Sequence, residues 1–308
     1  MTAFCLSRLL QSSIILFFLV TVSFFIIHAA PGGPFGGERQ LDPVTEQALK
    51  AKYHYDLPLH HQYVNYLERL LKLDLGLSTH HQSETVNEII RRTLPVSLLL
   101  GMIAMTMALL AGLSIGVYAA QRRNTLLDHA SMLGALAGLS LPVFVLGPLL
   151  QLLFSIKLRW LPIAGYAGMT GFSHLILPAA TLALPFTARI ARLMRAGMLD
   201  VLHMDYVRTA HSKGLGLRLV LWKHAFRGGV LPVVAYMGPA MASILTGSLV
   251  IESVFQIPGL GREFVQSALN RDVYLVLGTV VIYGTFIIFF NLLADLLSGW
   301  LDPRIRHS

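Results

Sequence analysis

The sequence predicts an all-α integral membrane protein with six transmembrane helices. Of its 308 residues, 55% are apolar and 13% are charged, whereas soluble domains carry about 25% charged residues. The mean hydropathy is +0.63. Six apolar runs approach or exceed the roughly 20 residues that a helix needs to cross a bilayer. They are residues 9–30, 95–120, 130–154, 174–190, 231–255 and 274–300.

The first and fourth runs have distinctive flanks. The first follows Arg8 in the manner of a signal peptide, but it is longer than the roughly 7–15 residues of a signal h-region. We therefore expect an uncleaved first helix. The fourth run contains Pro178 and Pro185 and continues into a segment with arginines at every third position. We expect that helix to leave the membrane with this basic face at the head groups. The three arginines are Arg189, Arg192 and Arg195.

The basic residues predict that both termini are cytoplasmic. With the N-terminus inside, the short inner segments hold thirteen lysines and arginines and the short outer loops hold four, as the positive-inside rule requires. Residues 31–94 then lie outside. Turn-rich residues open this segment, and short helices are expected at 43–53 and 62–73. Because the segment is too small for its own core, we expect it to lie against the spans.

One span contains a motif with two interpretations. Residues 112–116 have the form GxSxG, centred on Ser114, which marks the nucleophile of some hydrolases when it lies on a strained strand-to-helix turn. Gly112 and Gly116 are also small residues four apart, as are Gly134 and Gly138 in the next run. Such pairs let helices approach closely in lipid. Because the motif lies inside an uninterrupted apolar helix, we favour packing and keep an intramembrane hydrolase as the alternative.

Histidine pairs at 60–61 and 80–81 suggest a metal site, but adjacent residues of a helix point in different directions and chelate poorly. We favour a solvated loop and expect no metal. The single cysteine, Cys5, excludes an intrachain disulfide.

Two acids lie in or near spans, Glu252 and Asp295. Charged groups in lipid usually face a bundle interior or a watery cavity. They are candidates for a substrate pathway or for buried hydrogen bonds at helix ends, and their peripheral positions favour the second.

Eight of the 24 lysines and arginines lie between residues 189 and 227. We expect a helix at 202–213 in this segment, with Met204, Val207 and Ala210 on one apolar stripe. Gly214 would end that helix, and a second helix is expected at 217–227, ending at the glycine pair 228–229. The segment is either an interfacial anchor or a lever that a soluble partner can push.

At these residues the chain resembles the permease subunits of ATP-binding-cassette (ABC) importers. Their cytoplasmic signature reads EAA, three residues, Gly, and a variable stretch ending near Leu-Pro. Residues 208–210 (RTA) occupy the EAA position, Gly214 the glycine, and residues 231–232 (LP) the ending. Arginine replaces glutamate, and the gap after Gly214 is longer than in the general pattern. Both departures resemble the peptide branch of the family.

Further matches extend the resemblance over nearly the whole chain. They are residues 30–35 (APGGPF), 236–240 (YMGPA), 257–261 (IPGLG), 268–272 (ALNRD) and 302–306 (DPRIR). Within the oligopeptide and dipeptide permeases, the set is most similar to the first, B-type permease subunit of oligopeptide importers.

This resemblance implies the type I ABC importer permease fold, with a cytoplasmic coupling helix and a sizeable periplasmic segment between helices 1 and 2. The implied boundaries are an N-terminal helix at 1–30, a periplasmic segment at 31–92, a transmembrane domain at 93–300 and a cytoplasmic tail at 301–308. The coupling loop would occupy 195–230. The implied location is the bacterial inner membrane.

The resemblance also implies the partners, which are a second permease subunit, two ATP-binding subunits and a periplasmic or extracellular peptide-binding protein. ATP and Mg would be bound by the partners, so this chain would hold no cofactor and would not itself be an enzyme. We expect contact with membrane lipid and none with nucleic acid. The residues expected to couple to the ATPase are Met204, Asp205, Tyr206, Val207, Arg208, Thr209, Ala210, Lys213 and Gly214.

Three alternatives stay open at this point. A related importer for dipeptides, nickel or glutathione would share these motifs. A channel or secondary transporter would need no ATP-binding partner. The intramembrane hydrolase would depend on Ser114.

Overall fold

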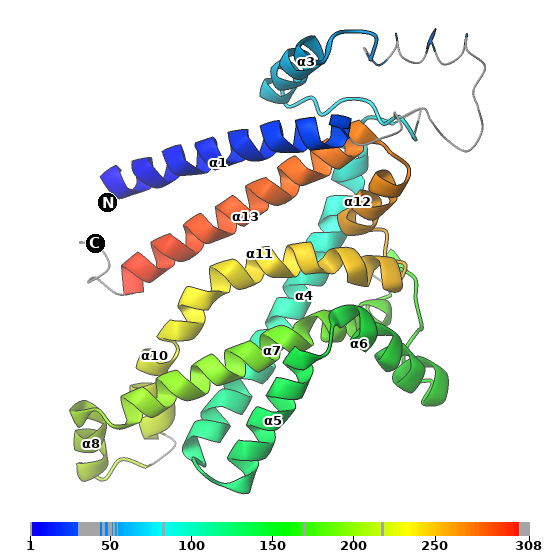
Figure 1. The fold of residues 1–308 in the computed structure, drawn as a ribbon. Helices are drawn as coiled ribbons and strands as arrows, with labels where there is room; N and C mark the ends of the chain where they lie inside the picture. Colours follow the sequence, from blue (N-terminus) through cyan, green and yellow to red (C-terminus); the bar gives the residue numbers. More distant parts are fainter. Residues whose placement is uncertain are drawn as a thin grey trace. The chain divides into compact units, whose positions relative to one another are not determined.

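The computed structural model describes residues 2–29, 44, 47–48, 51, 53, 55–81, 84–168, 171–216 and 219–301, and helices dominate it (Figure 1). Within these residues, extended chain pairs at an isolated bridge between Leu77 and Thr85. The all-α prediction is therefore confirmed. The predicted helix 43–53 lies largely outside the described residues, and the motifs at 30–35 and 302–306 lie entirely outside them.

Among the described residues, five helices are long and apolar enough to cross a membrane. They are α1 (Thr2–Ala29), α4 (Val86–Gln121), α7 (Ser173–Leu202), α11 (Leu231–Val254) and α13 (Val273–Leu301). These helices correspond to the first, second, fourth, fifth and sixth predicted runs. The fourth run does continue as one helix through its three arginines, with Pro178 and Pro185 inside it.

The third predicted run is not one helix. Helix α5 (Leu126–Ser140) ends before Leu141, whose ψ of 127° is extended. Helix α6 (Val143–Leu150) follows Pro142 and continues as the π-helix η1 (Gln151–Lys157). Proline disfavours helical geometry in the residue before it, which explains the break at Leu141. The count of six spans and the orientation of the termini stay predictions.

Helix α4 begins well before its apolar run because Thr85 and Glu88 form a capping box. The Thr85 N–H donates to the Glu88 carboxylate at 2.8 Å, and the Glu88 N–H donates to Thr85 Oγ1 at 3.2 Å. This reciprocal pair satisfies two amides that the first turn would otherwise leave unbonded. One turn later, Arg92 reaches back to both oxygens of Glu84 at 2.7 and 3.1 Å. This hydrogen bonding lowers the pKa of the Glu84 carboxyl.

The shorter helices lie close to the predicted positions. Helix α3 (Leu59–Leu71) corresponds to the helix expected at 62–73, and α8 (Asp205–Ser212) to that expected at 202–213. The π-helix η3 (Val220–Ala225) continues as α10 (Phe226–Gly229), which ends at the predicted glycine pair. Helix α12 (Leu260–Leu269) precedes α13 and was not predicted.

The chain divides into two compact units. The first comprises Met1–Ser97 and Pro258–Ile288, and the second comprises Leu98–Ile257 and Phe289–Ser308. The domain boundaries suggested by the sequence, with a transmembrane domain at 93–300, stay a prediction.

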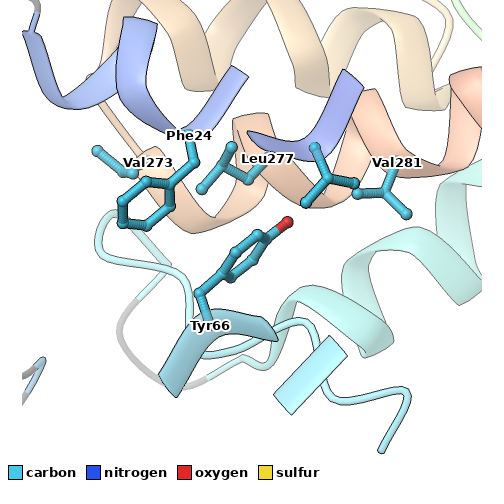
Figure 2. Packing of buried hydrophobic residues seen from close by; sticks show 6 residues of the cluster. Phe24, Tyr66, Val273, Leu277 and Val281 are labelled. Carbon is cyan, nitrogen blue, oxygen red and sulfur yellow. The ribbon is translucent and has the colours of Figure 1, made fainter. Parts of the chain in front are cut away.

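In the first unit, α3 packs against α1 and α13 through a small apolar core. Figure 2 shows Phe24 of α1 and Tyr66 of α3 lying beside three residues of α13. The Phe24 and Tyr66 rings stack with centroids 5.6 Å apart. The segment that follows the first span therefore lies against long helices, as expected from its small size. The core consists of Val20, Phe24, Tyr66, Val273, Leu277 and Val281.

A buried carboxylate ties the same segment to the start of α13. Asp272 is fully buried and accepts hydrogen bonds from the Ser78 hydroxyl and from the Leu275 N–H. The second bond caps α13. Tyr53 donates to the Ser78 carbonyl at 3.0 Å, so Ser78 is held from two sides. The motif at 268–272 thus includes a structural acid that joins residues nearly 200 positions apart.

In the second unit, α4 and α7 approach each other through glycines. A Cβ on Gly112 would lie 2.8 Å from the Ile190 side chain, and one on Gly116 would lie 2.6 Å from the Ala191 carbonyl. The Ser114 hydroxyl donates to the Leu110 carbonyl at 2.7 Å, one turn back in the same helix. The packing interpretation of residues 112–116 is confirmed. A Cβ on Gly134 would meet no atom of the described residues within 4 Å, so packing at the second pair stays a prediction.

Candidate functional site

The short helix α8 begins directly after α7. The Met204 carbonyl accepts the N–H of Val207 at 3.0 Å and that of Arg208 at 3.2 Å. Asp205 lies in the first turn, where a negative charge is favourable to the helix dipole.

Helix α8 ends in a left-handed closing turn. The Leu215 N–H bonds to the Ala210 carbonyl at 3.4 Å, and Gly214 has φ +76°. A 6→1 hydrogen bond across a left-handed residue is the Schellman pattern of helix termination. The predicted stop at Gly214 is therefore present.

The two sides of α8 differ in exposure. Val207 is 1% exposed and Ala210 is 6% exposed, so both face the interior of this chain. Met204 and Tyr206 are 48% and 47% exposed. The stripe predicted from Met204, Val207 and Ala210 is thus split, with two members inside and one outside.

The exposed face of α8 also carries charge. Arg208 lies 3.9 Å from Asp205, and both side chains are largely exposed. The Thr209 hydroxyl donates to the Asp205 carbonyl at 2.9 Å. The face combines an exposed aromatic and a thioether with polar groups of both signs. Its members are Met204, Asp205, Tyr206, Arg208, Thr209 and Lys213, and we call it the α8 face.

Helix α10 presses against α7 immediately before α8. A Cβ on Gly197 would lie 2.3 Å from the Gly229 carbonyl oxygen, and one on Gly228 would lie 2.9 Å from Val201. The backbones therefore touch at a crossing that only glycine permits. Next to it, Trp222 and Phe226 stack with centroids 5.3 Å apart. The end of α7, from which the chain continues into α8, is therefore tightly packed against α10. We call this contact the platform of α8.

The arginines of α7 do not form a simple basic face. Arg189 lies over the Tyr236 ring at 5.4 Å from its centroid. Arg195 makes two hydrogen bonds of 2.6 Å to Asp128 of α5. Sequence reasoning missed Asp128. The available signal was an acid three residues after Thr125, a spacing typical of a helix start.

Of the two acids near span ends, Glu252 is fully buried in α11. Its carbonyl accepts the Ile257 N–H at 2.8 Å beyond the helix end. Asp295 belongs to α13, and its side chain lies outside the described residues. The roles of both acids stay predictions.

The solvated-loop expectation holds for His80 and His81, whereas His60 and His61 lie in the first turn of α3, so it is wrong for that pair. The rings of His60 and His61 have centroids 4.2 Å apart, and those of His80 and His81 are 5.1 Å apart. His81 lies 3.8 Å from Glu263. In the part of the chain that the structure describes, no three His, Cys, Asp or Glu side chains form a group suited to a metal ion.

Comparison with known sequences gives consistent matches. Residues 112–307 match the family described as binding-protein-dependent transport system inner membrane component. The chain is 44% identical over 307 residues to the oligopeptide transport system permease protein OppB of Haemophilus influenzae, covering 100% of both chains. It is 43% identical, with the same coverage, to OppB of Escherichia coli. It is 41% identical to the dipeptide transport system permease protein DppB of Bacillus subtilis, covering 99% of this chain and 98% of that one.

A solved structure shares the fold. A chain in the crystal structure of an amino acid ABC transporter with histidines superposes with a TM-score of 0.52. The match covers 70% of this chain and 94% of that chain, at 18% identity. At this identity the likeness concerns the fold alone, and it agrees with the fold class expected from the sequence.

Proposed function

Because this chain belongs to the family of binding-protein-dependent transport system inner membrane components, we propose that it is the permease subunit of an ATP-driven peptide importer. It forms half of a transmembrane pathway together with a second, homologous permease subunit. Two ATP-binding subunits bind ATP and Mg and hydrolyse the nucleotide, and a periplasmic or extracellular protein delivers the peptide. Support for the peptide cargo comes from the names of relatives that are more than 40% identical over essentially the whole chain.

The observation that carries the coupling role is the exposure pattern of α8. Its buried side, Val207 and Ala210, fixes the helix to its own chain, while Met204 and Tyr206 leave apolar surface uncovered. Aromatic and methionine side chains are enriched at protein interfaces. An arginine and a lysine on the same face can pair with acids of a partner. The buried side of α8 thus packs against this chain, while the α8 face is available for a partner subunit to bind.

The mechanism that follows is alternating access. The ATP-binding subunits grip the α8 face on the cytoplasmic side, and their closure on ATP displaces it. Since α8 follows α7 after only Met204 and one further residue, its displacement moves the end of a membrane-crossing helix. The pathway then reopens to the other side. A helix that is pushed must resist bending, and the packed platform at Gly197 and Gly229 supplies that resistance.

A dipeptide cargo is the second candidate. The dipeptide permease of Bacillus subtilis is nearly as similar to this chain as the oligopeptide permeases are. The distinction is expected to reside mainly in the peptide-binding protein, so competition between peptides of different length in the assembled transporter would decide it.

The proposed function is tested by Tyr206→Ser in the assembled complex, with Leu71→Ser as the matched control. Tyr206 is 47% exposed and Leu71 is 86% exposed, so both substitutions lie on the surface of this chain. Tyr206→Ser should reduce co-purification of the ATP-binding subunits and uptake of labelled peptide. Leu71→Ser should leave both unchanged.

Interface aromatics of this kind are typically worth at least about 2 kcal/mol when they are hot spots. A Tyr206→Ser complex that holds its ATP-binding subunits and imports peptide normally would remove the α8 face from the coupling role. A wild-type complex that moves peptide without ATP would overturn the importer itself.

A further inference from the structure

The second unit contains a buried ion pair between α5 and α7. Arg195 Nε lies 2.6 Å from Asp128 Oδ1, and Arg195 Nη2 lies 2.6 Å from Asp128 Oδ2. The Asp128 side chain is 1% exposed and that of Arg195 is 25% exposed. Two parallel charge-assisted hydrogen bonds fix both the distance and the relative orientation of the two groups.

The same carboxylate also holds the turn between α4 and α5. The Asn124 N–H donates to Asp128 Oδ2 at 3.0 Å, and Asn124 has φ +62°. The Thr125 hydroxyl accepts the Asp128 N–H at 3.4 Å and donates to the Arg122 carbonyl at 2.7 Å. The carboxylate of Asp128, in the first turn of α5, therefore joins the α4–α5 turn to the last third of α7.

Helix α7 is joined to the platform of α8 only two residues beyond Arg195. There Gly197 lies against the Gly229 backbone of α10. On the other side of Arg195 along α7, Ala191 and Met194 lie against Gly116 of α4. The final turns of α7 thus contact α10 on one side and the α4–α5 corner on the other.

Opening the Asp128–Arg195 pair would leave a buried carboxylate without its partner, which is far more unfavourable than the pair's net contribution to stability. The pair therefore favours one fixed arrangement of α5 against α7 and opposes sliding between them. A pair with little net stabilising value but strong geometric preference is suited to transmit a displacement.

We propose that Asp128 and Arg195 are positioning residues that join α8, the end of α7 and the α4–α5 corner into one mechanical body. A displacement of α8 by the ATP-binding subunits then reaches α4 and α5 directly. This inference rests on the proposed function of α8, and it adds a transmission element outside the α8 face.

The test compares Asp128→Asn, Arg195→Gln and the double variant in the complete, reconstituted transporter. Three quantities are measured, namely complex abundance, ATP hydrolysis and peptide imported per ATP. Each single variant leaves one charge without its opposite charge, so abundance should fall. The double variant removes both charges and should recover abundance, while peptide imported per ATP stays at least about fivefold below wild type, the lower end of coupling effects between sites.

A purely structural pair would give the opposite pattern, because abundance and import per ATP would then recover together in the double variant. That result overturns the transmission role and leaves the importer intact. Failure of the wild-type complex to import peptide would instead count against the proposed function.

A second measurement keeps the Asp128–Arg195 pair intact, so it does not depend on variants of the pair itself. In a chain carrying Cys5→Ser, spin labels are placed at Arg123→Cys in the α4–α5 turn and at Ser212→Cys on α8. One mechanical body predicts the same inter-label distance in the nucleotide-free and ATP-bound complexes. A distance that shifts between the two states contradicts the proposal.

Discussion

Gly214 gives the sharpest single-residue prediction for α8. Its φ of +76° is left-handed, while an added Cβ would meet no atom of the described residues within 4 Å. Gly214→Ala therefore introduces backbone strain without a steric clash. The left-handed conformation costs a non-glycine residue roughly 1–2 kcal/mol. A loss of that size changes the ratio of intact to frayed helix by a factor of about 5–30.

Gly216 provides the matched control in the same loop. A Cβ there also meets no atom within 4 Å in the part of the chain that the structure describes, and its φ lies outside the left-handed region. Gly216→Ala should be neutral or slightly stabilising, because it only restricts the unfolded chain. Gly214→Asn should fall between the two, because asparagine tolerates the left-handed region better than alanine does.

The assay is hydrogen exchange of amides 205–215 in the purified complex, followed by peptide import. Gly214→Ala should accelerate exchange in this segment by about the same factor of 5–30 and reduce import. Complex abundance should stay near normal, because the strain is confined to an exposed turn. Equal exchange in Gly214→Ala and Gly216→Ala would refute the reasoning.

Three further predictions concern packing, hydrogen bonding and charge. Gly197→Ala should lower the free energy of unfolding by about 1–3 kcal/mol, because its Cβ would meet the Gly229 carbonyl at 2.3 Å. Gly134→Ala, whose Cβ would meet no atom of the described residues within 4 Å, should instead raise the free energy of unfolding by up to about 1 kcal/mol. Tyr63→Phe should destabilise by about 1 kcal/mol through loss of its 2.7 Å bond to Thr21. Tyr66→Phe should be neutral or stabilising, because among the described residues the buried Tyr66 hydroxyl has no hydrogen-bond partner; thermal melts of both variants in detergent decide this. The hydrogen bonds from Arg195, with further help from the Asn124 N–H and His129, lower the pKa of Asp128 although burial opposes this. The stabilisation from this pair should therefore be complete above the ordinary carboxyl pKa and disappear as the pH falls through the lowered value. The Asp128→Asn, Arg195→Gln double variant should lack that component in melts recorded against pH, and an unchanged acid profile would contradict it.

The sequence predicted the long helices well because their signal is simple. An apolar run flanked by charges specifies a span almost independently of its neighbours. The boundaries were less predictable. Helix α4 starts at Val86, well before its apolar run, because Thr85 and Glu88 cap it. Pro142 indicates the break in the helix at Leu141, but hydropathy alone does not indicate that break.

The candidate site was predictable in position and only partly in orientation. The spacing of Met204, Val207 and Ala210 predicted an apolar stripe on α8. A glycine directly after a lysine predicted the end of the helix at Gly214. Which residues of the stripe point inward depends on η3 and α10, which pack against α8 from a different part of the sequence. Asp128 was missed for the same reason, since its partner lies 67 positions away.

The central claim is that the α8 face is the surface gripped by the ATP-binding subunits. The most direct measurement places a photo-reactive phenylalanine analogue at Tyr206 in the complete transporter, with the same analogue at Leu71 as the control. Illumination should yield a covalent adduct between this chain and an ATP-binding subunit from position 206, and none from position 71. Adducts from position 206 that contain only lipid or the peptide-binding protein would contradict the account.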